Sequence, residues 1–356
     1  MHAEITGWGK CMPPSVLTND QMATVIDTTD EWITSRTGIR ERRVSHVPTS
    51  QLAAVAAQRA LAAAGMDAKD LDMIILATCT PDTNIPSCAA ATQLIIGASN
   101  AGVFDLNAGC TGFIYGLSVA TSMIKAGDHK RILVIGAERI TWYLNWTHRE
   151  TAVLFGDGAG AVILEATDEP VGLLASKLTC DATASEALKI ADFGTASNRF
   201  QTDYHNLTIQ FDGREIFRRA VKGMQEASEC VLKKSGVSKE DVDLVVPHQA
   251  NLRIIDSLSK FLGVPSEKVV VNIDSYGNTS AATVPVALTE ALEAGRVKPG
   301  STLLLAAFGA GLTCGAGIVR WGKRVTPIAQ SDAELPPCDT TALEILGEAL
   351  QASAAK

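Results

Sequence analysis

The chain has 356 residues, 46% of them hydrophobic and 20% charged, enough to bury the core of one large domain or of two fused similar ones. Its formal net charge of −8 argues against non-specific nucleic-acid binding, and an acidic partner would need a local basic patch. No apolar run reaches membrane-spanning length, and no leader-like basic and apolar segment begins the chain. The eight cysteines are scattered singly, without a CxxC pair or Cys/His cluster. We therefore expect a cytoplasmic protein with reduced thiols, no metal site and no membrane association.

The first predicted unit is a helix end, a short acidic turn and a buried strand in residues 64–76 (AGMDAKDLDMIIL). A second buried strand is predicted at 103–106, followed by Cys110 at the start of a helix that ends at Ala126-Gly127. A thiol there lies beside unpaired backbone N–H groups and the positive end of the helix dipole, which stabilise the thiolate. The position suits a nucleophile, although a cysteine in a Gly/Ala-rich turn is more often a small buried side chain.

The second half of the chain repeats the first. Residues 235–247 (SGVSKEDVDLVVP) follow 64–76 by 171 positions, whereas Asn278 and the helix after it follow Cys110 and its helix by 168. We interpret the three-residue difference as one small indel. Closing strands are predicted at 131–135 and 161–164, and again at 302–305 and 316–319. The repeat predicts a mostly parallel sheet sandwiched by helices, with Cys110 and Asn278 as symmetry mates at facing helix starts.

The repeat divides the chain into an N-terminal half (1–170), a C-terminal half (171–323) and a C-terminal extension (324–356). In the extension, 331–337 is typical of a linker. Thr341 and Glu344 then have the spacing of a capping box ahead of Leu346 and Leu350. We expect one short amphipathic helix there, packed on the body.

Polar residues gather after the predicted strands of the second half. His248 follows a strand, where open α/β sheets collect ligand-binding groups, although a lone histidine there is more often structural. Asn278, in Gly-Asn-Thr-Ser, equally suits a helix N-cap. The glycine-rich stretch 308–315 (FGAGLTCG) lacks the features of a P-loop or a dinucleotide fingerprint, and it indicates a close backbone approach.

Together these segments resemble the β-ketoacyl-acyl-carrier-protein synthase III family of condensing enzymes. The resemblance covers about residues 3–323 and implies an α/β, thiolase-like fold: an internally duplicated αβαβα layered architecture with pseudo-two-fold symmetry. The matching segments are 27–42 (DTTDEWITSRTGIRER), the Cys110 turn, 154–161 (LFGDGAGA), 248–251 (HQAN), 277–281 (GNTSA) and the Phe308 loop.

The resemblance implies a decarboxylative condensation of an acyl-CoA primer, which we expect to be acetyl-CoA, with malonyl-acyl carrier protein. Cys110 would carry the acyl group, and the backbone N–H groups of Cys110 and Ala310 would form an oxyanion hole. His248 and Asn278 would stabilise the enolate formed by loss of carbon dioxide. Acyl-CoA is a substrate, and no cofactor is implied. Phe308 resembles the aromatic residue beside the nucleophile and argues against a thiolase, which has a second catalytic cysteine there.

The resemblance also implies the outer contacts of the site. Trp32, Arg36 and Arg149 correspond to coenzyme A contacts, and Ile85 to a residue that closes the acyl pocket of the partner in a homodimer. Arg214, Arg218 and Lys222 fall on one helix face at i, i+4 and i+8, opposite an apolar side that includes Phe217. With Arg253, these three cations are candidates for docking the acidic carrier protein. Cys314 is interpreted as a packing residue.

Three alternatives stay open. The same fold and nucleophile serve starter condensation in polyketide or other secondary metabolism. They also serve acyl transfer to an oxygen or nitrogen nucleophile without decarboxylation. A non-catalytic partner subunit is the third alternative, but such subunits typically lack the nucleophile, and Cys110 is present.

Overall fold

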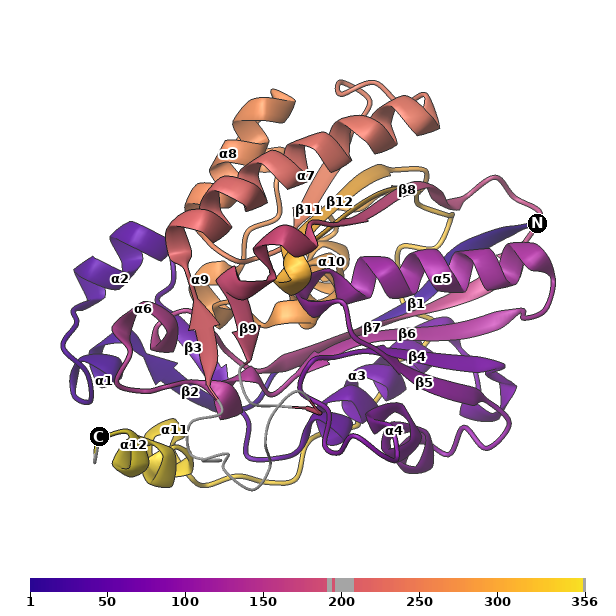
Figure 1. Cartoon of the computed structure of the whole chain (residues 1–356). Helices are drawn as coiled ribbons and strands as arrows, with labels where there is room; N and C mark the ends of the chain where they lie inside the picture. Colours follow the sequence, from indigo (N-terminus) through magenta and orange to yellow (C-terminus); the bar gives the residue numbers. More distant parts are fainter. Residues whose placement is uncertain (191–193, 196–207, 355–356) are drawn as a thin grey trace.

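The computed structural model describes residues 1–190, 194–195 and 208–354. In this part of the chain, the main sheet has nine strands in the order β11-β12-β13-β8-β1-β7-β6-β4-β5 (Figure 1). Its first part comprises β1 (His2–Cys11), β7 (Gly158–Thr167), β6 (Arg131–Glu138), β4 (Met73–Ala77) and β5 (Gly102–Leu106). Its second part comprises β8 (Gly172–Cys180), β13 (Thr313–Arg320), β12 (Thr302–Gly309) and β11 (Leu244–Pro247). The two parts meet only where Ala3 pairs with Gly172.

Helices fill the space between the two parts of the sheet and cover their outer faces (Figure 1). The central helices α5 (Gly112–Ala126) and α10 (Thr283–Glu293) contact strands of both parts. On the outside, α3 (Thr49–Ala64) and α4 (Cys88–Ile96) cover the first part, and α7 (Gly213–Ser235) covers the second beside α8 (Leu252–Leu262). This layering confirms the predicted αβαβα architecture. None of the helices within the described ranges is long and apolar enough to span a membrane.

Short elements gather on one side of these layers, at the left of Figure 1, around a separate apolar cluster. They are β2 (Ser15–Thr18), α1 (Asn19–Ala23), α2 (Asp30–Thr37), β3 (Glu41–Val44), α6 (Arg149–Ala152), β9 (Leu188–Ile190), β10 (Ile209–Phe211) and α9 (Ile273–Tyr276). The fully buried side chains of Leu17, Ile33 and Trp146 hold this cluster together.

The predicted repeat is visible in the acidic turns before β4 and β11. The Asp72 carboxylate accepts a hydrogen bond of 2.8 Å from the backbone N of Arg131. In the other half, the Asp243 carboxylate accepts one of 2.8 Å from the backbone N of Thr302. Each bond fixes the first residue of the neighbouring parallel strand, so the two halves use the same device 171 residues apart.

The same spacing continues into the turns that precede the central helices. Gly109 and Ser280 both adopt positive φ angles, of 55° and 52°. The Asn107 side chain accepts a hydrogen bond of 3.3 Å from the N of Gly109, and the Asn278 side chain accepts one of 2.8 Å from the N of Ser280. The two turns therefore have the same construction.

The prediction that Cys110 and Asn278 are symmetry mates is wrong. The matching turns pair Cys110 with Ala281, and Asn278 with Asn107. The three-residue difference lies within the helices, because α10 is shorter than α5, and the left-handed glycines after them, Gly127 and Gly295, keep the spacing of 168.

The prediction of a mostly parallel sheet is also wrong, because the sheet is mixed. β4 runs parallel to β5 and β6, and β11 runs parallel to β12. However, β7 is antiparallel to β1 and β6, and β13 is antiparallel to β12 and β8. The turn Ala310–Leu312 between β12 and β13 is too short for the crossover that parallel strands require.

The C-terminal extension packs along the first half. Ile328 N donates a hydrogen bond to the Ala63 carbonyl, and an Arg59 guanidinium N donates to the carbonyl of Ala333, in the segment predicted as a linker. The capping box is confirmed, since Thr341 and Glu344 exchange side-chain and backbone hydrogen bonds. It starts two short helices, α11 (Ala342–Ile345) and α12 (Gly347–Ala354), instead of the one predicted.

The close approach of β6 to the Ser280–Ala282 turn predicts a specific packing defect. A Cβ at Gly136 would lie 2.2 Å from the backbone O of Ala281, so Gly136→Ala has to displace the turn. We expect the free energy of unfolding in urea to fall by about 1–3 kcal/mol. Gly315→Ala is the control, because its Cβ would meet side-chain atoms at 3.4 Å or more. Equal losses of unfolding free energy in the two variants would contradict the predicted clash at Gly136.

Candidate active site

Cys110 lies in the turn Gly109–Thr111, between β5 and α5, and is 8% exposed. The Phe308 loop packs directly against this turn: a Cβ at Gly309 would lie 2.6 Å from the backbone N of Cys110. Glycine at position 309 therefore permits the backbone approach that the sequence predicted. It brings the N–H groups of Cys110 and Ala310 together at the Cys110 sulfur.

Burial raises the pKa of the Cys110 thiol to about 11. A hydrogen bond with the Ser280 side chain lowers this pKa, the Glu138 carboxyl raises it, and the N–H groups of Cys110 and Ala310 lower it. The start of a helix by itself predicts a stabilised thiolate. At Cys110 the cost of burying the charge outweighs this stabilisation, so the resting group is a thiol.

His248 follows β11 and is almost completely buried. Burial lowers the pKa of its imidazole to about 3, so the ring is neutral near pH 7. Its Nδ1 lies 2.6 Å from the Thr283 hydroxyl, which also lies 3.0 Å from the carbonyl O of Ser280. The first turn of α10 therefore fixes the orientation of the ring.

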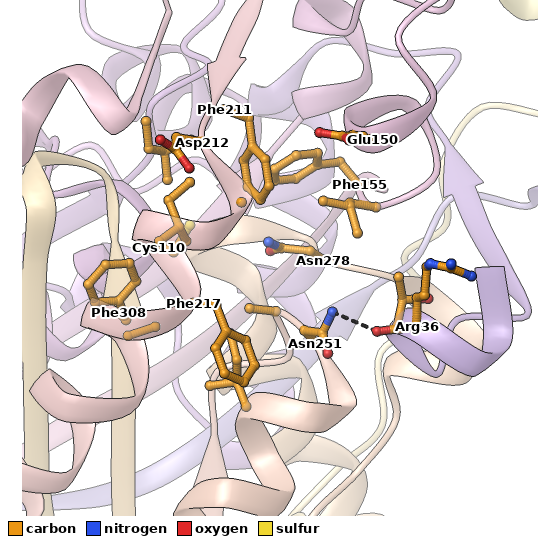
Figure 2. A pocket seen from close by; sticks show the side chains of 18 of the residues that line it. Arg36, Cys110, Glu150, Phe155, Phe211, Asp212, Phe217, Asn251, Asn278 and Phe308 are labelled. Carbon is orange, nitrogen blue, oxygen red and sulfur yellow. Dashed lines mark hydrogen bonds between the residues drawn. The ribbon is translucent and has the colours of Figure 1, made fainter. Parts of the chain in front are cut away.

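Asn278 is held by its backbone and by one end of its side chain. Its N donates to the Leu154 carbonyl at 2.8 Å, and its side-chain Oδ1 accepts from the N of Ser280 at 2.8 Å. With Oδ1 occupied in this way, the Nδ2 group is the part of the amide that serves as a donor to a ligand. Figure 2 shows this amide inside the cavity, between Cys110 and Asn251.

A cavity of about 680 Å³ is lined by all three predicted catalytic side chains, of which Figure 2 labels Cys110 and Asn278. Its volume and polar lining groups are those of a small-molecule site. Of the residues predicted from the sequence, those that line it are Trp32, Arg36, Cys110, Arg214, His248, Asn278 and Phe308.

A second cavity, of about 430 Å³, adjoins the first. Cys110 lines both cavities, as do Phe155 and Leu188. Ala310 and Asn84 line the second one. Ile85, next to Asn84, is 90% exposed and projects away from the described chain instead of filling a pocket of its own subunit.

The three predicted coenzyme A contacts form one cluster. The guanidinium carbons of Arg36 and Arg149 lie 4.6 Å and 4.5 Å from the Trp32 ring centroid. A guanidinium N of Arg149 also donates to the Asp27 carbonyl at 2.9 Å, which anchors it. The cluster carries two guanidinium groups, and Trp32 and Arg36 line the first cavity.

The predicted docking cations are exposed, but two of them have acidic partners on α7. Arg218 pairs with Glu215 at 2.7 Å, and Lys222 lies 3.7 Å from Glu226. Solvent screening makes such exposed pairs weak, so both cations stay available to a partner. Arg253 lies on α8, where its guanidinium donates to the Ser35 carbonyl at 3.0 Å.

The side chain of Phe217 does not lie where the sequence predicted. The helical pattern placed it on the buried side of α7, but its side chain is 39% exposed and lines the first cavity, as Figure 2 shows. The reason is that the N-terminal part of α7 extends over the cavity. Cys314, by contrast, is buried, and a Cβ at Gly223 of α7 would lie 2.2 Å from its sulfur. Close packing of β13 against α7 therefore accounts for Cys314.

Sequence reasoning missed Glu138, Ser280 and Thr283, which surround the nucleophile and the histidine. Glu138 carried a usable signal, since it is an acidic residue directly after the apolar run of a buried strand. Ser280 and Thr283 read as ordinary polar residues at a helix start, and only their contacts distinguish them.

Comparisons with known proteins agree with this geometry. Two family models match, 3-oxoacyl-[acyl-carrier-protein] synthase III over residues 104–182 and its C-terminal part over residues 232–321. Beta-ketoacyl-[acyl-carrier-protein] synthase III 2 of Vibrio cholerae is 55% identical over 98% of this chain and 97% of its own. The crystal structure of 3-oxoacyl-[acyl-carrier-protein] synthase III from Aquifex aeolicus is 44% identical, with a TM-score of 0.85 over 90% of this chain and 100% of that one.

A priming beta-ketosynthase from a polyketide biosynthetic pathway is 35% identical and also has a TM-score of 0.85, over 90% of this chain and 97% of its own. The fold, the grouping of Cys110, His248 and Asn278, and the identity along nearly the whole chain lead to the same conclusion. The chain belongs to the β-ketoacyl-[acyl-carrier-protein] synthase III family.

Proposed function

We propose that this protein condenses an acyl-CoA primer with malonyl-acyl carrier protein and releases a 3-oxoacyl-carrier protein. The observation that carries the proposal is the position of Cys110. Cys110 lines two adjoining cavities, and His248 and Asn278 line the first of them. One cavity suits the incoming thioester and the other the acyl chain. Residues of this chain supply every group that the reaction requires, so we propose no resident cofactor.

In the first half-reaction, the Cys110 sulfur attacks the thioester carbon of acyl-CoA and keeps the acyl group as a new thioester. The N–H groups of Cys110 and Ala310 are both directed at the Cys110 sulfur, and they stabilise the negative oxygen that forms there during the attack. The cluster of Trp32, Arg36 and Arg149 at the first cavity supports binding of the nucleotide and phosphates of coenzyme A.

In the second half-reaction, malonyl-acyl carrier protein loses carbon dioxide, and the resulting carbanion attacks the acyl group on Cys110. The Asn278 Nδ2 group donates to the thioester oxygen and stabilises the enolate. In the tautomer with its proton on Nε2, the neutral His248 ring provides the second donor. The Thr283 hydroxyl, 2.6 Å from Nδ1, then donates to Nδ1 instead of to the Ser280 carbonyl. An amide and a neutral imidazole polarise the thioester without removing a carbon-bound proton, which suits decarboxylation.

The wider assembly forms part of the same proposal. Ile85, Leu94 and Ile95 are 90%, 83% and 46% exposed, an apolar surface that supports a homodimer in which Ile85 enters the partner's acyl pocket. All eight cysteines, which lie in the described part of the chain, are unpaired. This supports a cytoplasmic location, where thiols stay reduced.

Starter condensation in polyketide synthesis is the second candidate. The 35% identical polyketide priming ketosynthase favours it. The two candidates share the acyl-cysteine chemistry and differ in the primer, so a comparison of primers separates them.

Acyl loading tests the first half-reaction. After incubation with acetyl-, butyryl- or octanoyl-CoA, intact-protein mass spectrometry should show one acyl group per chain with at least one primer, and Cys110→Ser should abolish the mass increase. Ile85 is smaller than an aromatic residue, so we expect butyryl-CoA to load as well as acetyl-CoA. Release of carbon dioxide from malonyl-acyl carrier protein by the loaded enzyme tests the second half-reaction, and loading without release would leave only simple acyl transfer.

The buried histidine predicts the pH dependence of decarboxylation. A histidine with an ordinary pKa near 6.5 gains a proton below that pH, whereas His248, with a pKa lowered to about 3, stays neutral. Carbon dioxide release in a single turnover of acyl-loaded enzyme should therefore show no inflection near pH 6.5 when it is followed from about pH 8 to about pH 5. An inflection there that disappears in His248→Gln would disprove the neutral role.

Charge reversal tests the docking surface. Arg218→Glu and Arg253→Glu should raise KM for malonyl-acyl carrier protein by about tenfold, since each removes a cation that faces solvent beside the cavity and adds an anion that repels an acidic partner. Acyl loading from acyl-CoA should be unchanged. Lys69→Glu, on the distant turn before β4, is the matched control. Equal losses in the two half-reactions would rule out a docking role.

A further inference from the structure

Glu138, at the end of β6, is a fully buried carboxylate beside the nucleophile. The hydroxyls of Thr80 and Thr78 donate to its Oε2 at 2.5 Å and 3.1 Å. The backbone N of Cys79 lies 3.2 Å from both of its oxygens. These bonds hold the carboxylate in one orientation, with Oε1 directed at Ser280.

Ser280 connects this carboxylate to the nucleophile. Its hydroxyl donates to Glu138 Oε1 at 3.0 Å, and it lies close enough to the Cys110 side chain to lower the pKa of that thiol. The positive φ of Ser280, 52°, is uncommon for a residue other than glycine, and the matching turn of the other half has Gly109 at this place. Glycine would adopt the φ angle at position 280 more easily, yet the chain has a residue with a hydroxyl group there.

The acylation chemistry needs a proton acceptor at this point. Cys110 rests as a thiol, and its proton has to leave when the sulfur attacks acyl-CoA. The imidazole of His248 binds a proton poorly, because burial lowers its pKa to about 3. Burial raises the pKa of the Glu138 carboxyl above its usual value, which makes this carboxylate the better acceptor.

We propose that Ser280 and Glu138 form a proton relay for Cys110, an inference that rests on the proposed function. As the bond between Cys110 Sγ and the acyl carbon forms, the thiol proton passes to Ser280 Oγ, and the Ser280 hydroxyl proton passes to Glu138 Oε1. The carbon–sulfur bond to coenzyme A breaks, and its thiolate takes a proton from water.

The relay then runs in reverse. When the carbanion attacks the acyl group, the bond between the acyl carbon and Cys110 Sγ breaks, and the sulfur leaves as a thiolate. It takes a proton from Ser280, and Ser280 is reprotonated by Glu138. The two half-reactions together consume one proton from water, which ends on coenzyme A, and the relay returns to its starting state.

Other titratable groups face the relay. The Cys79 thiol, at the end of β4, donates to Glu138 Oε1 at 3.3 Å and lies 3.9 Å from the Ser280 hydroxyl. Burial raises the pKa of the Tyr143 phenol, and the nearby Cys79 and Glu138 raise it further. Burial raises the pKa of Cys79 as well, so both groups keep their protons near pH 7 and leave Glu138 as the acceptor.

The test is the pH profile of acylation in a single turnover, measured with acetyl-CoA by rapid quench and intact-protein mass spectrometry. Wild-type enzyme should acylate at a rate nearly independent of pH between about pH 6.5 and 9. Glu138→Gln and Ser280→Gly should be about 100-fold slower at pH 7, the lower end of a typical general-base effect. Their rates should rise about tenfold per pH unit as hydroxide forms the thiolate instead.

Ser280→Gly keeps the turn, since glycine adopts the same φ freely, and it retains the N–H that holds Asn278. Asp157→Asn is the matched control for loss of a buried carboxylate. Asp157 is bonded to Thr141 and to the backbone of Ser45 and makes no contact with Cys110 among the described residues, so its profile should stay flat.

Two results would overturn the relay. Either variant could acylate at pH 7 as fast as wild type or faster, which would mean that Glu138 only raises the pKa of the thiol. Either variant could instead be slow at every pH with the wild-type flat profile, which would indicate a structural defect. Failure of the wild-type enzyme to acylate at all would refute the proposed function, so the two failures are distinguishable.

Discussion

The close backbone contact between the Gly109–Thr111 turn and the Phe308 loop is the constraint on which the site depends. A Cβ at Gly309 would lie 2.6 Å from the N of Cys110, so the two segments leave no room for a side chain at position 309. On the other side, Gly136 admits the Ser280–Ala282 turn at a similar distance. Cys110, the proposed oxyanion hole and the Asn278 amide are therefore positioned by backbone packing, which leaves little freedom to any of them.

That packing also sets the protonation states. Burial raises the pKa of Cys110 and lowers that of His248, so a thiol and a neutral imidazole share one cavity. Neither group is charged at rest, and the remaining polar groups at the nucleophile are N–H donors, a hydroxyl and the Glu138 carboxylate. A site of this kind stabilises charge that forms during reaction and needs a separate place for the thiol proton.

Much of the fold was predictable because its signals are local. Buried strands, helix ends and the acidic turns repeat in the sequence, and the hydrogen bonds of Asp72 and Asp243 show why they do. The prediction that Cys110 and Asn278 are symmetry mates was wrong, because the ends of the two central helices have a different spacing along the chain from their starts. The prediction of a mostly parallel sheet was wrong because strand direction depends on connection length and on long-range pairing, which apolar patterns do not encode.

The sequence by itself determined the family resemblance, the layered fold and the three side chains that meet in the cavity, since motif residues and periodicity are properties of the chain. Only the tertiary structure decided what surrounds them. It placed Glu138 and Ser280, which are 142 residues apart, within 3.0 Å of each other. It also moved Phe217 from an expected core position to the cavity wall. Contacts between distant segments and the loss of water around them set these properties, and both exist only after the two halves have packed.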